Sequence, residues 1–442
     1  MSTPITATAQ VAELAATSRI PASGTAGREK LVSCVLDHLT CLLAGQKCPH
    51  VAAPRQWAVA AGGAEEATAV GGSRLPAFLA AYVNGQTANG LDWDDMLVGH
   101  PGSAIISAAI AACESNGGSL ADAARGVMAG YEVHWALSRA AHPSAGRSSI
   151  VRGFTAWEAV AATAAAAVAR SASEATIARA LGVVATHAPV PYLGKWYERP
   201  VPSVKNNLGW AAAIGVMSTQ LAEQGVSGVT NVLDGPNGLW VMAGSDKWDW
   251  QPSGDAMAAI ERVGFKQYPA CWHIQEQLVT VADLLTRSPI GGRQDVVVTY
   301  GGPPALRRFM DWAPAGSADL AFSLPTLTAL LLDGQNLDST TLYDPANVSR
   351  AVRKAENCVR YQEDGRSWVR IADTSGSELS SDITDRDEFN PGPRGLNADE
   401  VVAKYLRTAE PILGDGRADE LKTIVEGDWE AHKITELTAY FS

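Results

Sequence analysis

Apolar residues recur every three or four positions through most of the first half of the chain, and this spacing predicts helices. Residues 28–43 carry one such apolar face, formed by Leu31, Cys34, Val35, Leu39 and Leu42. Further helices are predicted over residues 75–85, 103–113, 120–141, 156–170 and 174–184. Residues 105–112 and 161–169 carry small side chains on all sides, so we expect these helices in a closely packed helical core.

The pattern changes near Gly254. Residues 294–300 form a β-branched run that ends in Gly301-Gly302, and this run predicts a strand. Residues 367–373 alternate apolar and polar positions, which predicts a second, half-buried strand. Helices are predicted between the strands and at the end of the chain, over residues 325–332, 345–357, 398–408 and 418–429.

The predicted fold class is mainly α, with one large all-helical domain and one smaller α+β domain. We expect the helical domain to begin with residues 1–252, the α+β domain to span residues 253–391, and residues 392–442 to rejoin the helical domain. The chain has no GxGxxG motif after a strand and no GxxxxGK(S/T) motif, so a nucleotide-binding fold has no support.

The charge balance argues against nucleic acid and membranes as partners. The 442-residue chain has a formal net charge of −12, and its lysines and arginines form no cluster. Its longest alanine-rich tract, residues 159–169, is bounded by charged residues and is too short to cross a bilayer. Because the N-terminus lacks a secretory pattern and the six cysteines show no CxxC or metal-binding spacing, we expect a cytoplasmic protein with buried free thiols.

The densest group of ionisable residues lies within residues 90–103, between two predicted helices. Three carboxylates, one tryptophan and one histidine fall within the nine residues from Asp92 to His100. A histidine beside carboxylates titrates near neutral pH and can transfer a proton, which is typical of an active-site loop. The alternative is structural: Asp94 or Asp95 caps the following helix, and His100 fills a turn.

Three other segments place polar groups beside predicted helices or at the predicted domain boundary. Arg152 and Thr155 open an alanine-rich helix, whose N-terminus can bind an anion or can simply be capped by Thr155. Lys205 precedes a buried helix and can hold a substrate carboxylate or lie at the surface. Lys266 and Tyr268 fall where the helical region gives way to the α+β region, and clefts form at such boundaries.

Together these segments resemble the MmgE/PrpD family, which includes 2-methylcitrate dehydratase and cis-aconitate decarboxylase. Five matches occur in the family's order: Leu-Asp-aromatic-Asp-Asp ending in His-Pro (91–101), Arg-Gly-Phe before an alanine-rich helix (152–156), Lys before Trp-Ala-Ala (205–212), Lys-x-Tyr-Pro-x-Cys (266–271), and Phe-Ser-Leu-Pro before Leu-Leu-Asp-Gly (322–334). No single motif is specific, but five in order are typical of the family.

The resemblance implies a large helical domain with a smaller α+β lid, a homodimer, and chemistry on small carboxylic acids without a metal or an organic cofactor. It also implies catalytic positions, which are His100, Asp92, Lys266 and Lys205. The expected substrate-binding residues are Thr155, Arg152, Tyr268, Trp93 and Met96.

Three positions depart from the family pattern and lose or shorten a polar side chain. Met96 stands where the family often has threonine, Thr155 where it often has histidine, and Thr326 where tyrosine is usual. Each lost hydrogen bond to a charged group would leave a substrate carboxylate underbound by roughly 1.5–3 kcal/mol. A larger, less acidic substrate than methylcitrate is therefore favoured.

The sequence thus predicts a cofactor-independent lyase, a dehydratase that removes water from a β-hydroxy carboxylic acid. His100 is the expected principal proton-transfer group, with Asp92 orienting it. Decarboxylation or epimerisation at the same α-carbon is one alternative, because these reactions share an enolate-like intermediate. A catalytically silent binding protein is another, motivated by the three departures.

Overall fold

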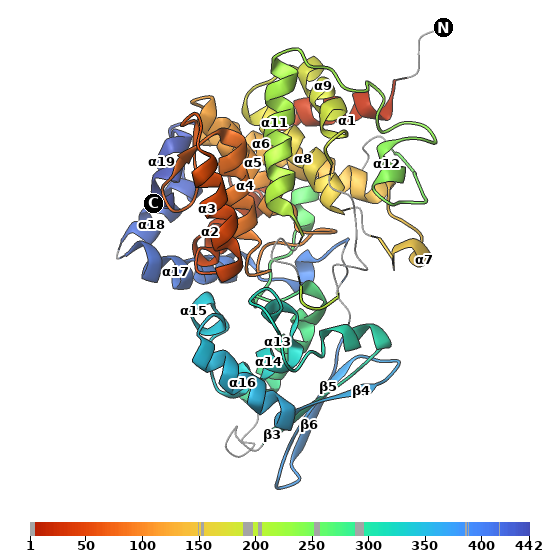
Figure 1. Ribbon diagram of the computed structural model, residues 1–442, viewed down its shortest axis with the longest axis vertical. Helices are drawn as coiled ribbons and strands as arrows, with labels where there is room; N and C mark the ends of the chain where they lie inside the picture. Colours follow the sequence, from red (N-terminus) through yellow and green to blue (C-terminus); the bar gives the residue numbers. More distant parts are fainter. Residues whose placement is uncertain are drawn as a thin grey trace.

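The computed structural model describes residues 5–148, 150–151, 154–188, 198–201, 206–251, 257–287, 296–384, 387, 389–414 and 416–442. Its elements form two groups, which lie one above the other in Figure 1. We call the upper group the helical part (α1–α12 and α17–α19) and the lower group the α+β part (α13–α16 and β3–β6). The predicted fold class is confirmed: the protein is mainly α with a smaller α+β region.

Most of the helical part comes from the first half of the chain. Its helices there are α1 (Ala7–Thr17), α2 (Ala26–Gly45), α3 (Pro49–Ala61), α4 (Ala77–Ala88), α5 (Pro101–Ser115), α6 (Leu120–Ala140), α7 (Ala145–Ser148), α8 (Phe154–Ala169), α9 (Glu174–Val184), α11 (Leu208–Glu223) and α12 (Leu239–Met242). Two very short antiparallel strands lie beside α4, and they are β1 (Ala67–Thr68) and β2 (Arg74–Leu75). The helices predicted from apolar spacing are confirmed as α2, α4, α5, α6, α8 and α9.

Helix α8 lies at the centre of the helical part. It packs against α5, α6, α9 and α11, and nearly all of its side chains from Ala156 onward are buried. Glycines on its neighbours approach it closely: a Cβ on Gly126 of α6 would lie 2.5 Å from the carbonyl oxygen of Ala165. The alanines of α8 therefore set the spacing between the helices, as their small size on all sides predicts.

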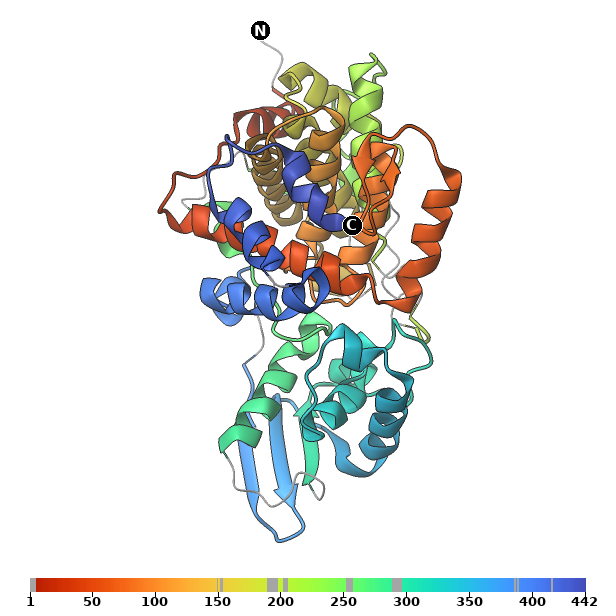
Figure 2. The ribbon, with the colours of Figure 1, turned by 90° about the vertical axis from the view of Figure 1, so that its left-hand side faces the viewer.

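The last three helices of the chain pack on the helical part. They are α17 (Ala398–Leu413), α18 (Arg417–Glu426) and α19 (Ile434–Thr438). Helices α17 and α18 contact α2, and α19 contacts α5 and α6; Figure 2 shows these blue helices beside the orange-red α2. The predicted domain boundaries at residues 252 and 391 stay predictions.

The α+β part is built on a four-stranded sheet in the order β4-β3-β5-β6. Its strands are β3 (Val296–Gly302), β4 (Val359–Glu363), β5 (Trp368–Asp373) and β6 (Glu378–Asp382). Strand β3 runs parallel to β4 and antiparallel to β5, and β5 runs antiparallel to β6. Its helices are α13 (Gln275–Arg287), α14 (Leu324–Leu332), α15 (Ser339–Leu342) and α16 (Pro345–Cys358).

The two strands predicted from sequence are the central ones, β3 and β5. The edge strands β4 and β6 escaped prediction because most of their side chains are exposed or half-buried, so they show no apolar alternation. All six cysteines are buried, and no disulfide bond joins any two of them. Within the described residues, no helix has the length and apolar character needed to cross a membrane.

Gly215→Ala is expected to destabilise the protein, although alanine is the better helix former. The added Cβ would lie 2.8–2.9 Å from atoms of Ala162 and Thr163 on α8, so α8 and α11 must separate, at a cost of about 1–3 kcal/mol. The midpoint of thermal unfolding should fall. The control is Gly146→Ala on α7, where the added Cβ meets no atom within 4 Å. Equal midpoints for both variants would contradict the close packing of α11 on α8.

Candidate active site

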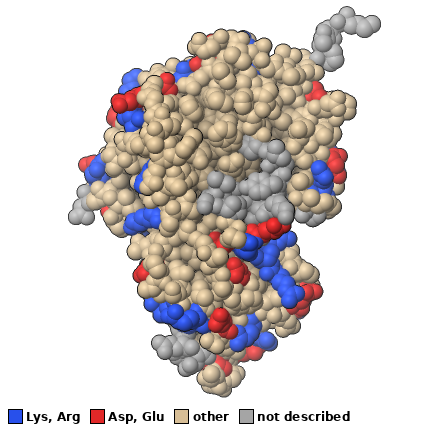
Figure 3. Space-filling model, viewed as in Figure 1, with Lys and Arg blue, Asp and Glu red and all other residues tan. Residues whose placement is uncertain are grey.

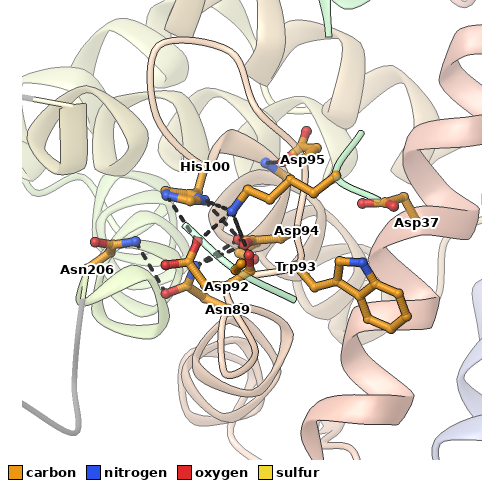
Figure 4. Close-up of polar contacts among 12 residues, drawn as sticks. Asp37, Asn89, Asp92, Trp93, Asp94, Asp95, His100 and Asn206 are labelled. Carbon is orange, nitrogen blue, oxygen red and sulfur yellow. Dashed lines mark hydrogen bonds and ion pairs between the residues drawn. The ribbon is translucent and has the colours of Figure 1, made fainter. Parts of the chain in front are cut away.

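A buried lysine lies at the centre of the predicted active-site loop. The side chain of Lys266 is 0% exposed, and its ammonium donates to the backbone oxygen of Asp92 at 2.7 Å and to Asp92 Oδ1 at 2.5 Å. The same nitrogen lies 3.7 Å from Asp94 Oδ1 and 3.4 Å from His100 Nδ1. Figure 4 shows Asp92, Asp94 and His100 turned toward one another. Four ionisable groups therefore meet in a volume that the protein shields from water.

Polar side chains hold the loop between α4 and α5 in place. Asn89, at the end of α4, donates its amide to both oxygens of Asp94, at 3.1 and 2.9 Å, and Ser103 donates its hydroxyl to Asp94 Oδ2 at 2.6 Å. Asp92 has a φ of 54°, a left-handed conformation that costs a non-glycine residue about 1–3 kcal/mol. Such strain persists only where other contacts fix the residue, and the two bonds from Lys266 do so here.

Asp95 fills the structural role that was the alternative for this loop. Its Oδ1 accepts a hydrogen bond from the Gly102 backbone N–H at 2.9 Å, in the first turn of α5, and its Oδ2 accepts one from the Tyr131 hydroxyl at 2.5 Å. Burial raises the pKa of Asp95 to about 7. Asp94 differs, because its Oδ1 lies 3.2 Å from His100 Nδ1.

Two segments far apart in the sequence run side by side at this site. Met96 and Gly264 exchange two backbone hydrogen bonds, at 2.9 and 3.0 Å, and the indole N–H of Trp93 donates to the carbonyl of Gln267 at 3.1 Å. The side chains of Met96 and Trp93 are 2% and 1% exposed, so both pack inside the protein. Their contact with substrate stays a prediction.

Helix α8 contributes a buried acid behind His100. The backbone N–H of His100 donates to Glu158 Oε1 at 2.6 Å, whereas the His100 side chain is 12% exposed. Burial raises the pKa of Glu158 well above its usual value, and within the described residues its Oε2 has no hydrogen-bond partner. Burial thus favours the neutral carboxyl. Sequence reasoning missed Glu158, although a single acid inside an apolar helix is a recognisable signal.

Two opposing influences set the charge of Lys266. Burial, the largest single influence, lowers its pKa, but the charges of Asp92 and Asp94 and the hydrogen bond to Asp92 raise it. The net result is a pKa above the ordinary lysine value. Lys266 is therefore an ammonium at neutral pH, and it depends on the two carboxylates to stay charged in the interior.

The same carboxylates and histidine have the chemistry of a metal site. One donor atom from each of Asp92, Asp94 and His100 lies within 4.8 Å of the others. However, the Lys266 ammonium lies among these atoms, at 2.5–3.7 Å. A metal ion would have to displace this charge, so in this arrangement the lysine supplies the cation that the three groups need.

The remaining predicted residues are placed as follows. Thr155, on α8, donates its hydroxyl to the carbonyl of Asn206 at 3.2 Å, and the Asn206 amide lies 3.5 Å from Asn89 Oδ1. This chain of contacts links the start of α8 to the loop that carries Asp94. Arg152 and Lys205 lie outside the described residues.

Tyr268 lies at a different cavity. This cavity has a volume of about 440 Å³ and lies between α17 and residues 335–340, where Tyr268 lines it with Trp93 and Lys404. Its lining does not include His100 or Lys266. The structure thus brings Asp92, His100 and Lys266 together and places Tyr268 in the lining of another cavity.

The fold and the site describe a mainly helical protein whose α4–α5 loop holds a buried acid–base centre of one histidine, one lysine and two carboxylates. The sequence model of the MmgE/PrpD N-terminal domain matches residues 9–251, more than half of the chain. The chain belongs to the MmgE/PrpD family, whose members are generally dehydratase-like. A search of curated proteins found no match.

Asp95→Asn is expected to reduce the pH dependence of stability. The folded protein holds the Asp95 proton up to about pH 7, whereas the unfolded chain releases it near pH 3.8, so the free energy of unfolding falls as pH rises through this window. Asparagine cannot ionise. Between pH 6 and 7 the wild-type protein should lose on the order of 1 kcal/mol relative to the variant. Urea unfolding at pH 6 and 7 measures this, and parallel losses in both proteins would contradict it.

Proposed function

We propose that this protein is a cofactor-independent lyase that removes water from a β-hydroxy carboxylic acid. The observation that carries the proposal is the meeting of His100, Lys266, Asp92 and Asp94 in one buried cluster. Dehydration next to a carboxylate needs a base for the α-proton, a positive charge near the developing enediolate, and an acid for the departing hydroxyl. Membership of a family that is generally dehydratase-like supports the same reaction.

His100 is the proposed proton-transfer group. Asp94 Oδ1 lies 3.2 Å from Nδ1, closer than Asp92 Oδ1 lies to Nε2, at 3.8 Å. We therefore assign the orienting role to Asp94, and the holding of Lys266 to Asp92. With the Nδ1 proton directed at Asp94, Nε2 takes the α-proton. The electron pair of the broken C–H bond forms the double bond as the bond from the β-carbon to the hydroxyl oxygen breaks, and the departing hydroxyl takes a proton from the protonated His100 Nε2 and leaves as water.

Lys266 is the proposed counter-charge for the enediolate. Negative charge builds up on the substrate carboxylate when the α-proton leaves, and a cation acts more strongly on it in a buried site than in water. The ammonium lies 3.4 Å from His100 Nδ1, next to the group that removes the proton. Lys205 keeps, on the family resemblance, the role of binding the substrate carboxylate.

The three departures from the family pattern support a substrate that is less acidic than methylcitrate. Thr326 is 0% exposed and its hydroxyl accepts a hydrogen bond from Ser323 at 2.8 Å, and Thr155 donates to the Asn206 carbonyl. Met96 has no hydrogen-bonding side chain. The Thr155 hydroxyl is used as a donor within the protein and Met96 offers no donor, which leaves fewer donors for a polyacid.

The proposed assembly is a homodimer in the cytoplasm, with a small carboxylic acid as the ligand. The family resemblance is its main support. On the face drawn in Figure 3, charged side chains are sparser over the helical part than over the α+β part, and a face buried against a second copy is depleted of charge.

His100→Asn and Lys266→Met are each expected to lower kcat/KM by at least about 100-fold, because each removes a proton-transfer group or the charge beside it. The matched control is His187→Asn, which changes an exposed histidine at the end of α9 and should keep wild-type turnover. Thermal unfolding of each variant separates lost chemistry from lost folding. Wild-type turnover by folded His100→Asn protein would contradict the assignment.

A screen of hydroxy acids in D₂O distinguishes the reactions that this centre can perform. We expect a product that is lighter by one water, detected by mass spectrometry. Loss of carbon dioxide would instead indicate a decarboxylase, and deuterium at the α-carbon without unsaturation an epimerase. Ligands that bind without any product would indicate a catalytically silent binding protein.

A further inference from the structure

A second buried lysine lies behind the proposed active site. Lys404 of α17 is 1% exposed, and its ammonium donates to Asp37 Oδ1 on α2 at 2.7 Å, to the carbonyl of Trp93 at 3.0 Å and to the carbonyl of Lys266 at 3.3 Å. The nitrogen also lies 4.3 Å from the centre of the Trp93 ring. An ammonium has three N–H donors, so each donor has an acceptor.

The two carbonyls belong to the segments that form the site. Trp93 directly follows Asp92, and the other carbonyl is that of Lys266 itself. Lys404 therefore joins the α4–α5 loop to the Lys266 segment at the point where Lys266 reaches Asp92 Oδ1. Asp92 and His100 lie within the residues 9–251 that match the family's N-terminal domain, whereas Lys404 lies outside them. A C-terminal helix therefore contacts a site whose histidine belongs to the N-terminal domain.

The ion pair between Lys404 and Asp37 is poorly arranged for stability alone. Asp37 is 1% exposed, and within the described residues its Oδ2 has no hydrogen-bond partner. Burial is the largest influence on its pKa and raises it. Buried pairs of this kind contribute little net stability, and apolar side chains of similar volume often replace them without loss. Apolar side chains could replace the ion pair, but they could not donate hydrogen bonds to the carbonyls of Trp93 and Lys266 as Lys404 does.

We propose that Lys404 is a positioning residue, which sets the contact between Lys266 and Asp92 by binding the carbonyls of Trp93 and Lys266. This inference rests on the proposed function of the Lys266 centre. A shift of about 1 Å in such a centre costs about 100-fold in rate.

The test is the double variant Asp37→Leu with Lys404→Met, which replaces the pair by apolar side chains. We expect kcat to fall about 100-fold, with KM within about threefold of wild type, in a protein that is still folded at the assay temperature but whose midpoint of thermal unfolding is lower, because two buried carbonyls lose a donor. The matched control is Lys422→Met with Glu426→Leu, which removes an exposed pair on α18. Wild-type kcat in folded Asp37→Leu/Lys404→Met protein would overturn the proposal.

Asp37→Asn decides the question if the double variant does not fold. The asparagine oxygen can still accept from Lys404, and the two carbonyl bonds stay in place, so kcat should stay within about threefold of wild type. A 100-fold loss in folded Asp37→Asn protein would overturn the proposal, because the ion pair rather than the carbonyl bonds would then be essential.

A measurement without substrate separates this proposal from the proposed function. Titration of the Lys266 ammonium by ¹⁵N NMR should give a lower midpoint in the double variant, because burial lowers its pKa and the carboxylates that raise it are no longer held against it. An unchanged midpoint would overturn the positioning role. A lowered midpoint in a protein whose wild type dehydrates no acid would support positioning and refute the lyase function.

Discussion

The charge of Lys266 is the constraint on which the rest of the site depends. An ammonium with no exposed surface is stable only beside carboxylates that are themselves held in place. Asp92 and Asp94 raise the Lys266 pKa against the effect of burial, and Asp92 takes a left-handed backbone conformation to do so. The hydrogen bonds from Lys266 therefore hold the conformation of the loop between α4 and α5, and the carboxylates of this loop keep Lys266 charged.

The four buried acids around Lys266 differ in their protonation and in the groups they contact. Burial raises the pKa of Glu158 well above its usual value and the pKa of Asp95 to about 7, and these acids accept hydrogen bonds from the backbone N–H groups of His100 and Gly102. Asp92 and Asp94 face the ammonium of Lys266 and the imidazole of His100. Acids of one chemical type thus differ in their pKa values, because their burial and partners differ.

The sequence predicted the elements with strong apolar periodicity and the residues that lie in local motifs. Asp92, His100 and Lys266 stand in such motifs, and the fold brings them together. Glu158, Asp37 and Lys404 stand outside the five motifs, and their partners lie 58 to 367 residues away, so the sequence does not show which residues they contact. Tyr268 shares a motif with Lys266, yet it lines a different cavity, because the chain bends from residue 267 onward instead of continuing as an extended segment.

The departures from the family pattern fall outside this network of charges. Met96 meets Gly264 through its backbone, so the change from threonine alters no bond that holds the loop. Thr155 donates a hydrogen bond in the first turn of α8, and Thr326 accepts one in the first turn of α14; neither bond is to Lys266 or its carboxylates. Since Asp92 and Asp94 raise the pKa of Lys266 against the effect of burial, a change at either carboxylate affects the whole centre. Residues outside the centre can change one at a time. The proposed lyase chemistry can therefore persist while the acid it acts on changes.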